Sequence, residues 1–252
     1  MPNKIRIESG GAVRTVTLTR GDKRNALDGE MLNELEDAFS VTPPDAERLT
    51  VLRAEGPVFC AGLDMRNREG TTAGISPIES MLYAVETYPL PVVGVVQGDA
   101  IAGGNELALH CDIVVASSIA RFGMSLAQIG LAPTWFLAKK LLEVAGPVKT
   151  REFLFLGDPF PAEQMHEMGL IARVAPPEQL EAEAEKIIDR LAANAPLSLK
   201  AMKALLVREM CFRDGIYHKD VDQLVTLCGQ SEDAKEGVAA RLEKRAAKFH
   251  GR

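Results

Sequence analysis

The first third of the chain alternates between apolar and polar positions in a way that predicts a hairpin and then a helix. Two alternating runs, at about 5–7 and 13–18, flank a glycine-rich turn, which is typical of paired strands. After Asp28, apolar residues recur at helical spacing as far as Phe39, just before a pair of prolines. Asp28 is therefore expected to cap a helix that lies on the sheet.

The middle of the chain repeats the order strand, turn, helix. The apolar patterns predict strands at 48–54, 91–96 and 112–117, and helices at 77–87 and 103–110. This order predicts a layered α/β core.

From Pro133 onward, helical patterns dominate. We expect two helices that end at Gly146 and Gly157, and one short strand at 170–175. From about residue 196 the chain is predicted to consist of amphipathic helices. Neither a low-complexity linker nor a short repeat interrupts the sequence.

Length and composition favour a globular protein. A chain of 252 residues with 46% hydrophobic residues can form one large domain with an appendage. The longest apolar stretches, such as 90–96, are far shorter than the roughly 20 residues that span a bilayer. The four cysteines show neither metal-site nor disulfide spacing, and the first residues lack an apolar signal core. We therefore expect a cytoplasmic protein with no membrane partner.

The charge of the chain disfavours nucleic acid as a partner. The net charge is −6, and basic residues are dispersed along the sequence instead of forming one stripe. A small polyanionic ligand would need only a few local cations, such as Lys23, Arg24, Arg66 and Arg68.

A glycine pair, Gly103 and Gly104, precedes a predicted helix and is followed by Glu106 on its first turn. Free N–H groups at a helix start carry a positive partial charge that suits an anion. An ordinary helix start nevertheless explains this pair better when it is considered alone, since glycines before helices are common and glutamate is favoured in a first turn.

A second glycine turn follows a predicted strand at Cys60. Gly62 bends the chain there and leaves the amide of Leu63 without an obvious ladder partner. Two such amides from separate turns can converge on an oxyanion, as in many acyl-transfer enzymes. Two unrelated tight turns would give the same spacing, so both explanations stay open.

Other candidate groups are weaker. Cys60 lacks a basic partner at a useful spacing, which favours a small buried cysteine over a nucleophile. His110 lies four residues after Glu106 and can orient it, although a core histidine is the better explanation. Because HExxH and the common nucleotide-binding motifs are absent, we expect no metal site and no dinucleotide site.

Four segments in this order resemble the crotonase superfamily, the enoyl-CoA hydratase and isomerase family. They are KRNALDGEM at 23–31, GPVFCAGLDM at 56–65, the stretch 91–117, and SEDAKEGVAARLEKR at 231–245. The resemblance implies an α/β fold, a crotonase-like (ClpP/crotonase) spiral of ββα units. Its core would occupy 1–195, and 196–252 would form an α-helical trimerisation region of a homotrimer or a dimer of trimers.

The resemblance also implies an acyl-CoA thioester as the ligand, with coenzyme A as part of the substrate and no tightly bound cofactor. The amides of Leu63 and Gly103 would hold the thioester oxygen, and Glu106 would act as general acid or base with a pKa raised by its apolar surroundings. Lys244 or Phe249 of a neighbouring subunit would complete the pocket. The other residues expected to bind substrate are Lys23, Asn25, Ala26, Leu27, Ala61, Gly62, Asp64, Arg66, Gly104 and Leu126.

The chain departs from the hydratase pattern at Leu126, where hydratases of this family carry a second glutamate. Glu79, Tyr83 and Glu86 could replace it, although an exposed helix face is the favoured explanation for these three, and Ser125 or Gln128 could bind without titrating.

Three functions remain open. They are an enoyl-CoA hydratase or isomerase, an acyl-CoA decarboxylase or hydrolase, and a noncatalytic acyl-CoA binder. Retention of both glycine turns and of Glu106 speaks against the last.

Overall fold

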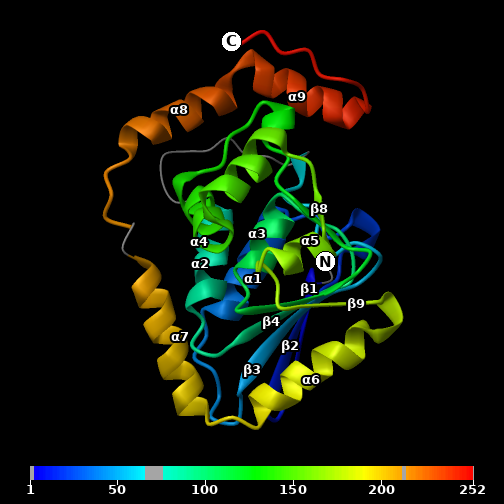
Figure 1. Ribbon diagram of the computed structural model, residues 1–252, viewed down its shortest axis with the longest axis vertical. Coiled ribbons are helices and arrows are strands. Elements are labelled where there is room, and N and C mark those ends of the chain that lie inside the picture. The colour runs from blue at the N-terminus through cyan, green and yellow to red at the C-terminus, as the bar shows by residue number, and fades with distance from the viewer. Residues whose placement is uncertain (1–2, 66–75, 212–213, 252) are drawn as a thin grey trace.

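A computed structural model describes residues 3–65, 76–211 and 214–251. Arg66, Arg68 and most of the loop before the second helix lie outside these residues. The predicted hairpin is present as β1 (Ile5–Gly10) and β2 (Val13–Leu18), which pair antiparallel. It forms one edge of a mixed sheet (Figure 1).

The main sheet has the order β1-β2-β3-β4-β6-β9. From β2 onward the neighbouring strands are parallel. This arrangement confirms the repeated order expected from the sequence, because parallel neighbours need a crossover between them. The further strands are β3 (Leu49–Ala54), β4 (Val92–Val96), β6 (Ile113–Ser117) and β9 (Arg173–Ala175).

Helices cover both faces of the sheet, and the strand pattern explains why. Alternate residues of β4 belong to different apolar clusters: Val92 and Val96 to the main core, Val93 and Val95 to a smaller one. The smaller cluster includes Ile188 of α6 (Leu180–Ala192), which crosses this face (Figure 1). The main core includes side chains of α1 (Gly29–Phe39), α2 (Pro77–Thr87) and α3 (Gly103–Leu109).

Capping explains where the first two of these helices begin. Asp28 accepts the N–H of Met31 at 3.0 Å, which confirms the predicted cap of α1. The cap of α2 is Ser76, which forms a reciprocal capping box with Glu79, and Pro77 occupies the first helical position.

A small second sheet was not expected. It contains β5 (Ala100–Ile101), β7 (Arg121–Gly123) and β8 (Phe160–Pro161), in which β7 is central. Strands of two or three residues are too short to show an apolar alternation, so no pattern along the chain predicted them. This sheet lies beside the predicted site, because an isolated bridge joins Cys60 to Ala100.

The remainder of the chain is mainly helical, as predicted. In α4 (Trp135–Arg151) the backbone breaks at Gly146, which has a φ of 67°, and the following π-helical turn (Glu152–Leu156) ends at Gly157 with a φ of 72°. The remaining helices and helical turns are α5 (Ala162–Glu167), α7 (Pro196–Met210), α8 (Lys219–Gln230), α9 (Glu232–Glu243), Gly21–Lys23, Ala127–Ile129 and Pro177–Gln179.

The C-terminal helices extend along and across the core. One side of the core carries α7, and α8 and α9 cross the end at which α4 lies (Figure 1). A buried Lys203 fastens α7, since its ammonium group pairs with Asp112 at 2.7 Å and donates to the carbonyl of Leu90 at 3.1 Å.

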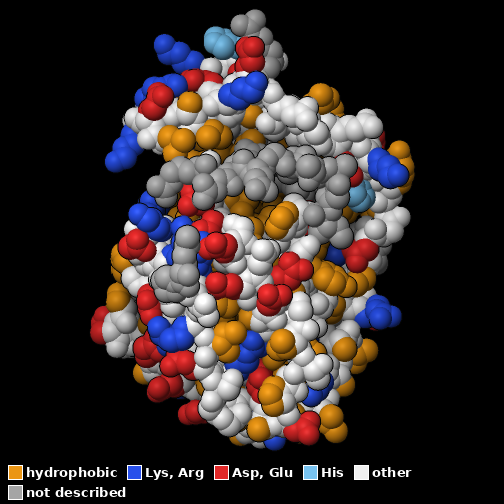
Figure 2. All heavy atoms as spheres, turned by 180° about the vertical axis from the view of Figure 1, so that it is seen from behind, with side chains coloured by type: hydrophobic (Ala, Val, Ile, Leu, Met, Phe, Trp, Pro, Cys, Tyr) orange, Lys and Arg blue, Asp and Glu red, His pale blue; other side chains and the backbone are white. Residues whose placement is uncertain are grey.

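The described surface carries mixed charge. On the face in Figure 2, Lys and Arg side chains are scattered among acidic ones and do not form a stripe. None of the helices in the described ranges has the length and apolar character needed to cross a membrane.

Candidate active site

The two glycine turns singled out in the sequence lie against each other. The backbone of Leu27 holds the first turn, because its N–H donates to Gly62 O and its carbonyl accepts from the N–H of Asp64, both at 2.8 Å. Gly62 has a φ of +87°, and a Cβ added there would lie 3.1 Å from the backbone nitrogen of Gly103. The turns are therefore in van der Waals contact.

A strained residue orients the second turn. Ala102 has a φ of 49° and a ψ of −116°, a conformation that residues with a Cβ rarely adopt. Its N–H donates to Gly123 O at 2.7 Å, and its carbonyl accepts from the N–H of Glu106 at 3.1 Å. These bonds hold Ala102 in place and direct the chain into α3 with Gly103 as the first helical residue.

The amides of Leu63 and Gly103 have no backbone acceptor among the described residues. Both residues line the same cavity. Gly103 also starts a helix, whose dipole adds positive partial charge at its N–H. Two free N–H groups on one cavity wall are what an oxyanion site requires, so the expectation of an oxyanion site stays a prediction.

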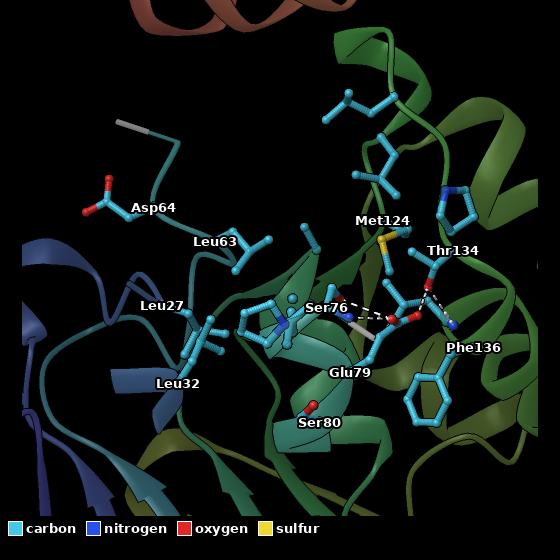
Figure 3. A pocket seen from close by; sticks show the side chains of 18 of the residues that line it. Leu27, Leu32, Leu63, Asp64, Ser76, Glu79, Ser80, Met124, Thr134 and Phe136 are labelled. Atoms are coloured by element: carbon cyan, nitrogen blue, oxygen red, sulfur yellow. Dashed lines mark hydrogen bonds between the residues drawn. The ribbon is translucent and has the colours of Figure 1, made fainter. Parts of the chain in front are cut away.

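Apolar side chains form much of the cavity around these amides. Figure 3 shows Leu27, Leu63, Met124 and Phe136 around it, and Leu126 also belongs to its lining. The polar side chains Ser76, Glu79 and Thr134 form a group within this lining (Figure 3). The cavity thus has an apolar wall with one polar cluster on it.

Glu106 lies inside the protein, and it does not belong to the described residues that line the cavity. Both of its carboxyl oxygens are buried and have no hydrogen-bond partner in the part of the chain that the structure describes. Burial raises the pKa of Glu106 to about 8, although the charge of Lys140 opposes this rise. The side chain is therefore mostly protonated at neutral pH.

His110 packs beside Glu106 on the same helix. Its Nδ1 contacts Glu106 O at 2.7 Å and lies 3.9 Å from a carboxyl oxygen of that residue. Burial and the charge of Lys140 lower the pKa of His110 to about 3, so the ring is neutral. Phe136 stacks on this ring at 5.3 Å between centroids and also lines the cavity, so it separates His110 from the ligand space.

The E106Q variant is expected to lose stability less steeply than the wild type between pH 5 and pH 8. The pKa of Glu106 is about 8 in the folded state and 4.5 in the unfolded state, so the protonated carboxyl group contributes stability that is fully present below pH 4.5. This stability is lost as the pH rises toward about 8. We expect this difference to be on the order of a few kcal/mol. Urea unfolding at both pH values measures it.

E86Q is the matched control with the opposite sign. Burial opposes ionisation of Glu86, but the charge of Lys140, together with that of Lys139, outweighs it and holds the pKa of Glu86 below its usual value. The stability from this pair is present at neutral pH and lost as pH falls through the lowered pKa. Equal pH dependence of wild type and E106Q would contradict the burial of an ionisable group at position 106.

Some of the residues predicted to bind the ligand line the cavity, and others lie outside this lining and support it. Those on the wall are Ala26, Leu27, Ala61, Asp64 and Leu126. Lys23, Asn25, Gly62 and Gly104 do not belong to the described lining, and Arg66 lies outside the described residues.

Two of the supporting residues have clear structural partners. The amide of Asn25 donates to Glu55 O and Val58 O, each at 2.8 Å. A Cβ added to Gly104 would lie 2.2 Å from Cys60 O, so Gly104 allows α3 to approach the first turn. Both residues therefore shape the turns from behind.

The polar cluster at the start of α2 was underestimated from the sequence. Glu79 is half-buried, accepts hydrogen bonds from Ser76, and receives the hydroxyl of Thr134. Glu86 is also half-buried and pairs with Lys140 at 2.5 Å, whereas Tyr83 is exposed. The expectation of an exposed face is therefore correct for Tyr83 and wrong for the two glutamates.

The favoured interpretation of Cys60 is confirmed. Its side chain is buried, its thiol contacts Asn25 O at 3.1 Å, and burial raises its pKa to about 12. Such a thiol is not a nucleophile at neutral pH. The described ranges contain no group of three or more His, Cys, Asp and Glu residues arranged to hold a metal ion.

Comparison with known proteins identifies the family of this chain, and it is the family whose motifs the two glycine turns resemble. The family model for enoyl-CoA hydratase/isomerase matches residues 8–252. The chain belongs to this family. It is 32% identical to enoyl-CoA hydratase EchA19 of Mycobacterium tuberculosis, over 98% of this chain and 96% of that protein. It is 33% identical to 1,2-epoxyphenylacetyl-CoA isomerase of Escherichia coli K12, over 98% and 97%.

Solved structures of the enoyl-CoA hydratase/isomerase family have the same fold. An enoyl-CoA hydratase of Mycobacterium avium subsp. paratuberculosis superposes with a TM-score of 0.86 at 26% identity, covering 98% of both chains. The predicted crotonase fold is therefore confirmed, and the protein is a member of a family of acyl-CoA enzymes.

Proposed function

We propose that this family member is an enzyme that binds an acyl-CoA thioester and stabilises its enolate with the amides of Leu63 and Gly103. The observation that carries the proposal is the contact between two turns, each with one N–H group, of Leu63 and of Gly103, that has no backbone acceptor among the described residues and lies on the same cavity. The names of the relatives, which act on CoA thioesters, support the same substrate class.

The chemistry follows from where charge develops. When a bond to the carbon next to the thioester carbonyl breaks, its electron pair moves onto the carbonyl oxygen. Two N–H dipoles fixed around that oxygen stabilise the charge without reorganisation, and each donor of this kind contributes on the order of 3 kcal/mol. This term lowers the barrier for isomerisation, hydration and decarboxylation alike.

Leu126 favours decarboxylation as a second candidate reaction. This leucine lines the cavity at the position where the hydratase pattern has its second glutamate. Hydration needs one group to activate water and another to protonate carbon. Decarboxylation needs only cleavage of the carbon–carboxylate bond, release of CO₂ and later protonation of the enolate, so an apolar wall is compatible with it.

The proposal extends to self-association and location. The C-terminal helices expose apolar side chains that an oligomer would cover, and the predicted trimer or dimer of trimers is tested by light scattering after size exclusion. In such an assembly, Lys244 or the partly exposed Phe249 would contribute to the site of a neighbouring subunit. A cytoplasmic location of the protein stays a prediction. The exposed side chains are Leu197, Met202, Leu205, Leu206, Leu224 and Leu227.

Turnover assays with three thioesters test the proposal. Crotonyl-CoA measures hydration, a 3-enoyl-CoA measures isomerisation, and methylmalonyl-CoA measures decarboxylation. Calorimetric titration with a nonreactive CoA thioether measures binding separately. Turnover of any one substrate supports enolate chemistry, whereas tight binding without any turnover would instead favour a noncatalytic binder.

A further inference from the structure

The proposed enolate chemistry needs a group that moves protons at the α-carbon of the acyl group, and the buried Glu106 is poorly placed for it. Its carboxyl group is enclosed, and Phe136 forms the cavity wall beside its neighbour His110. A proton carrier has to come within hydrogen-bond reach of the atom that it protonates. The acids that line the cavity are therefore the better candidates.

Most acids on the wall have other partners. Asp28 caps α1 and pairs with Lys4 at 2.7 Å. Asp64 pairs with Arg20 at 3.5 Å, and Asp222 on α8 contacts the Nδ1 of His218 at 2.8 Å. Glu30 and Glu36 belong to α1, where Glu30 pairs with Lys4. Asp28, Glu30 and Glu36 thus belong to the α1 edge and Asp222 to α8, whereas Asp64 lies in the first glycine turn, where Arg20 pairs with it.

Glu79 differs because polar groups from two helix starts fix it among apolar residues. One carboxyl oxygen accepts the N–H and the hydroxyl of Ser76, both at 3.1 Å. The other accepts the hydroxyl of Thr134 at the start of α4. Because the Thr134 oxygen also accepts the N–H of Leu137, its single hydroxyl proton is left for Glu79.

The start of α2 also lies close to the proposed oxyanion site. A Cβ added to Gly103 would lie 2.8 Å from Cδ1 of Ile78, the residue next to Glu79. Figure 3 shows Glu79 beside Thr134 and Met124, on the cavity side of α2. The residue before Glu79 therefore adjoins Gly103, and Glu79 and Gly103 line the same cavity.

We infer that Glu79 is the catalytic residue that transfers protons at the α-carbon of the acyl group, and that Ser76 and Thr134 are its positioning residues. This inference rests on the proposed enolate chemistry. The carboxylate takes a proton from the carbon next to the thioester carbonyl, and the C–H electron pair moves onto the oxygen held by the two amides. Return of the proton to carbon reverses the step, so no oxidant or further reactant is needed.

Exchange of the α-protons of butyryl-CoA with D₂O tests the inference, because it needs no particular downstream reaction. E79Q keeps the length of the side chain and one acceptor oxygen, for either Ser76 or Thr134, but cannot take up the proton. We expect its exchange rate to fall at least 100-fold, with the Kd for a CoA thioether unchanged. E86Q, on the same helix and away from the cavity lining, is the matched control and is expected to keep the wild-type rate.

The rival variant is E106Q, which is expected to lose far less activity than E79Q. T134V is expected to reduce kcat about tenfold without changing KM. T134S is expected to restore kcat, because the hydroxyl group of Thr134, and not its methyl group, positions Glu79. Melting temperatures and circular dichroism check that each variant is folded. If E79Q is unfolded, E79D replaces it, with the shorter acid expected to show slower exchange and unchanged binding.

The outcomes separate the inference from the proposed function. Wild-type exchange with equal rates in E79Q, or a larger loss in E106Q than in E79Q, overturns the role of Glu79 and leaves the oxyanion site standing. Absence of both exchange and turnover in the wild type overturns the proposed chemistry and, with it, the inference.

Discussion

G62A is expected to lower kcat/KM for whichever acyl-CoA thioester is turned over by about 100-fold, with the chain still folded. An alanine Cβ would lie 2.8 Å from Ile101 O and 3.1 Å from the nitrogen of Gly103. Backbone atoms cannot rotate away, so the two turns have to separate. Loss of one aligned donor costs on the order of 3 kcal/mol of transition-state stabilisation, which corresponds to this factor.

G11A is the matched control for this effect. Gly11 also has a positive φ, at +60°, but a Cβ added there meets nothing within 4 Å. Alanine therefore adds similar backbone strain, about 1 kcal/mol, without moving the turns. Steady-state kinetics and urea unfolding of both variants separate strain from displacement. Equal activity in G62A and wild type would contradict an oxyanion site between residues 63 and 103.

G104A is expected to destabilise the protein by roughly 2 to 4 kcal/mol, the largest stability effect predicted for this site. A Cβ at this position would approach three Cys60 atoms, at 2.2, 2.7 and 2.8 Å, of which two belong to the backbone. Relief of this overlap requires α3 to move away from the first turn. Because Gly103 starts the same helix, activity is expected to fall together with stability.

G29A is the control for the helix itself. Gly29 is the first residue of α1, and a Cβ added there meets nothing within 4 Å. This substitution is expected to be neutral or stabilising by up to about 1 kcal/mol, since alanine loses less backbone entropy than glycine in a helix. Comparable unfolding free energies for the two variants would show that the approach of α3 to Cys60 is not tightly packed.

The sequence predicted those parts of the fold and site that depend on local chemistry. Alternation predicted the first hairpin, Asp28 predicted the start of α1, and the glycines at 62 and 103 predicted both turns. Short sequence segments indicate these features, because a cap, a positive φ or a period of two depends on adjacent residues. Their contact was expected only through the resemblance to a family.

The parts that could not be predicted depend on contacts between distant segments. Glu106 lies in the interior with Phe136 packed on its neighbour, although its place on the first turn of α3 suggested a pocket residue. Glu79 meets Thr134 from another helix, a pairing that no sequence spacing reveals. The capping-box spacing from Ser76 to Glu79 was the one available signal, and it indicates a helix start whether or not a ligand lies nearby.

One wall of the cavity comes from α8, a helix in which no residue is buried. It contacts the core where His218, its cap, stacks on Trp135 at 4.5 Å and where the thiol of Cys228 donates to Gly130 O at 3.1 Å. Local opening of such a segment costs much less free energy than global unfolding. In the free chain this helix can therefore detach while the sheet stays intact, and both a bound thioester and the proposed oligomer would slow amide hydrogen exchange in α8 before they change exchange in the strands.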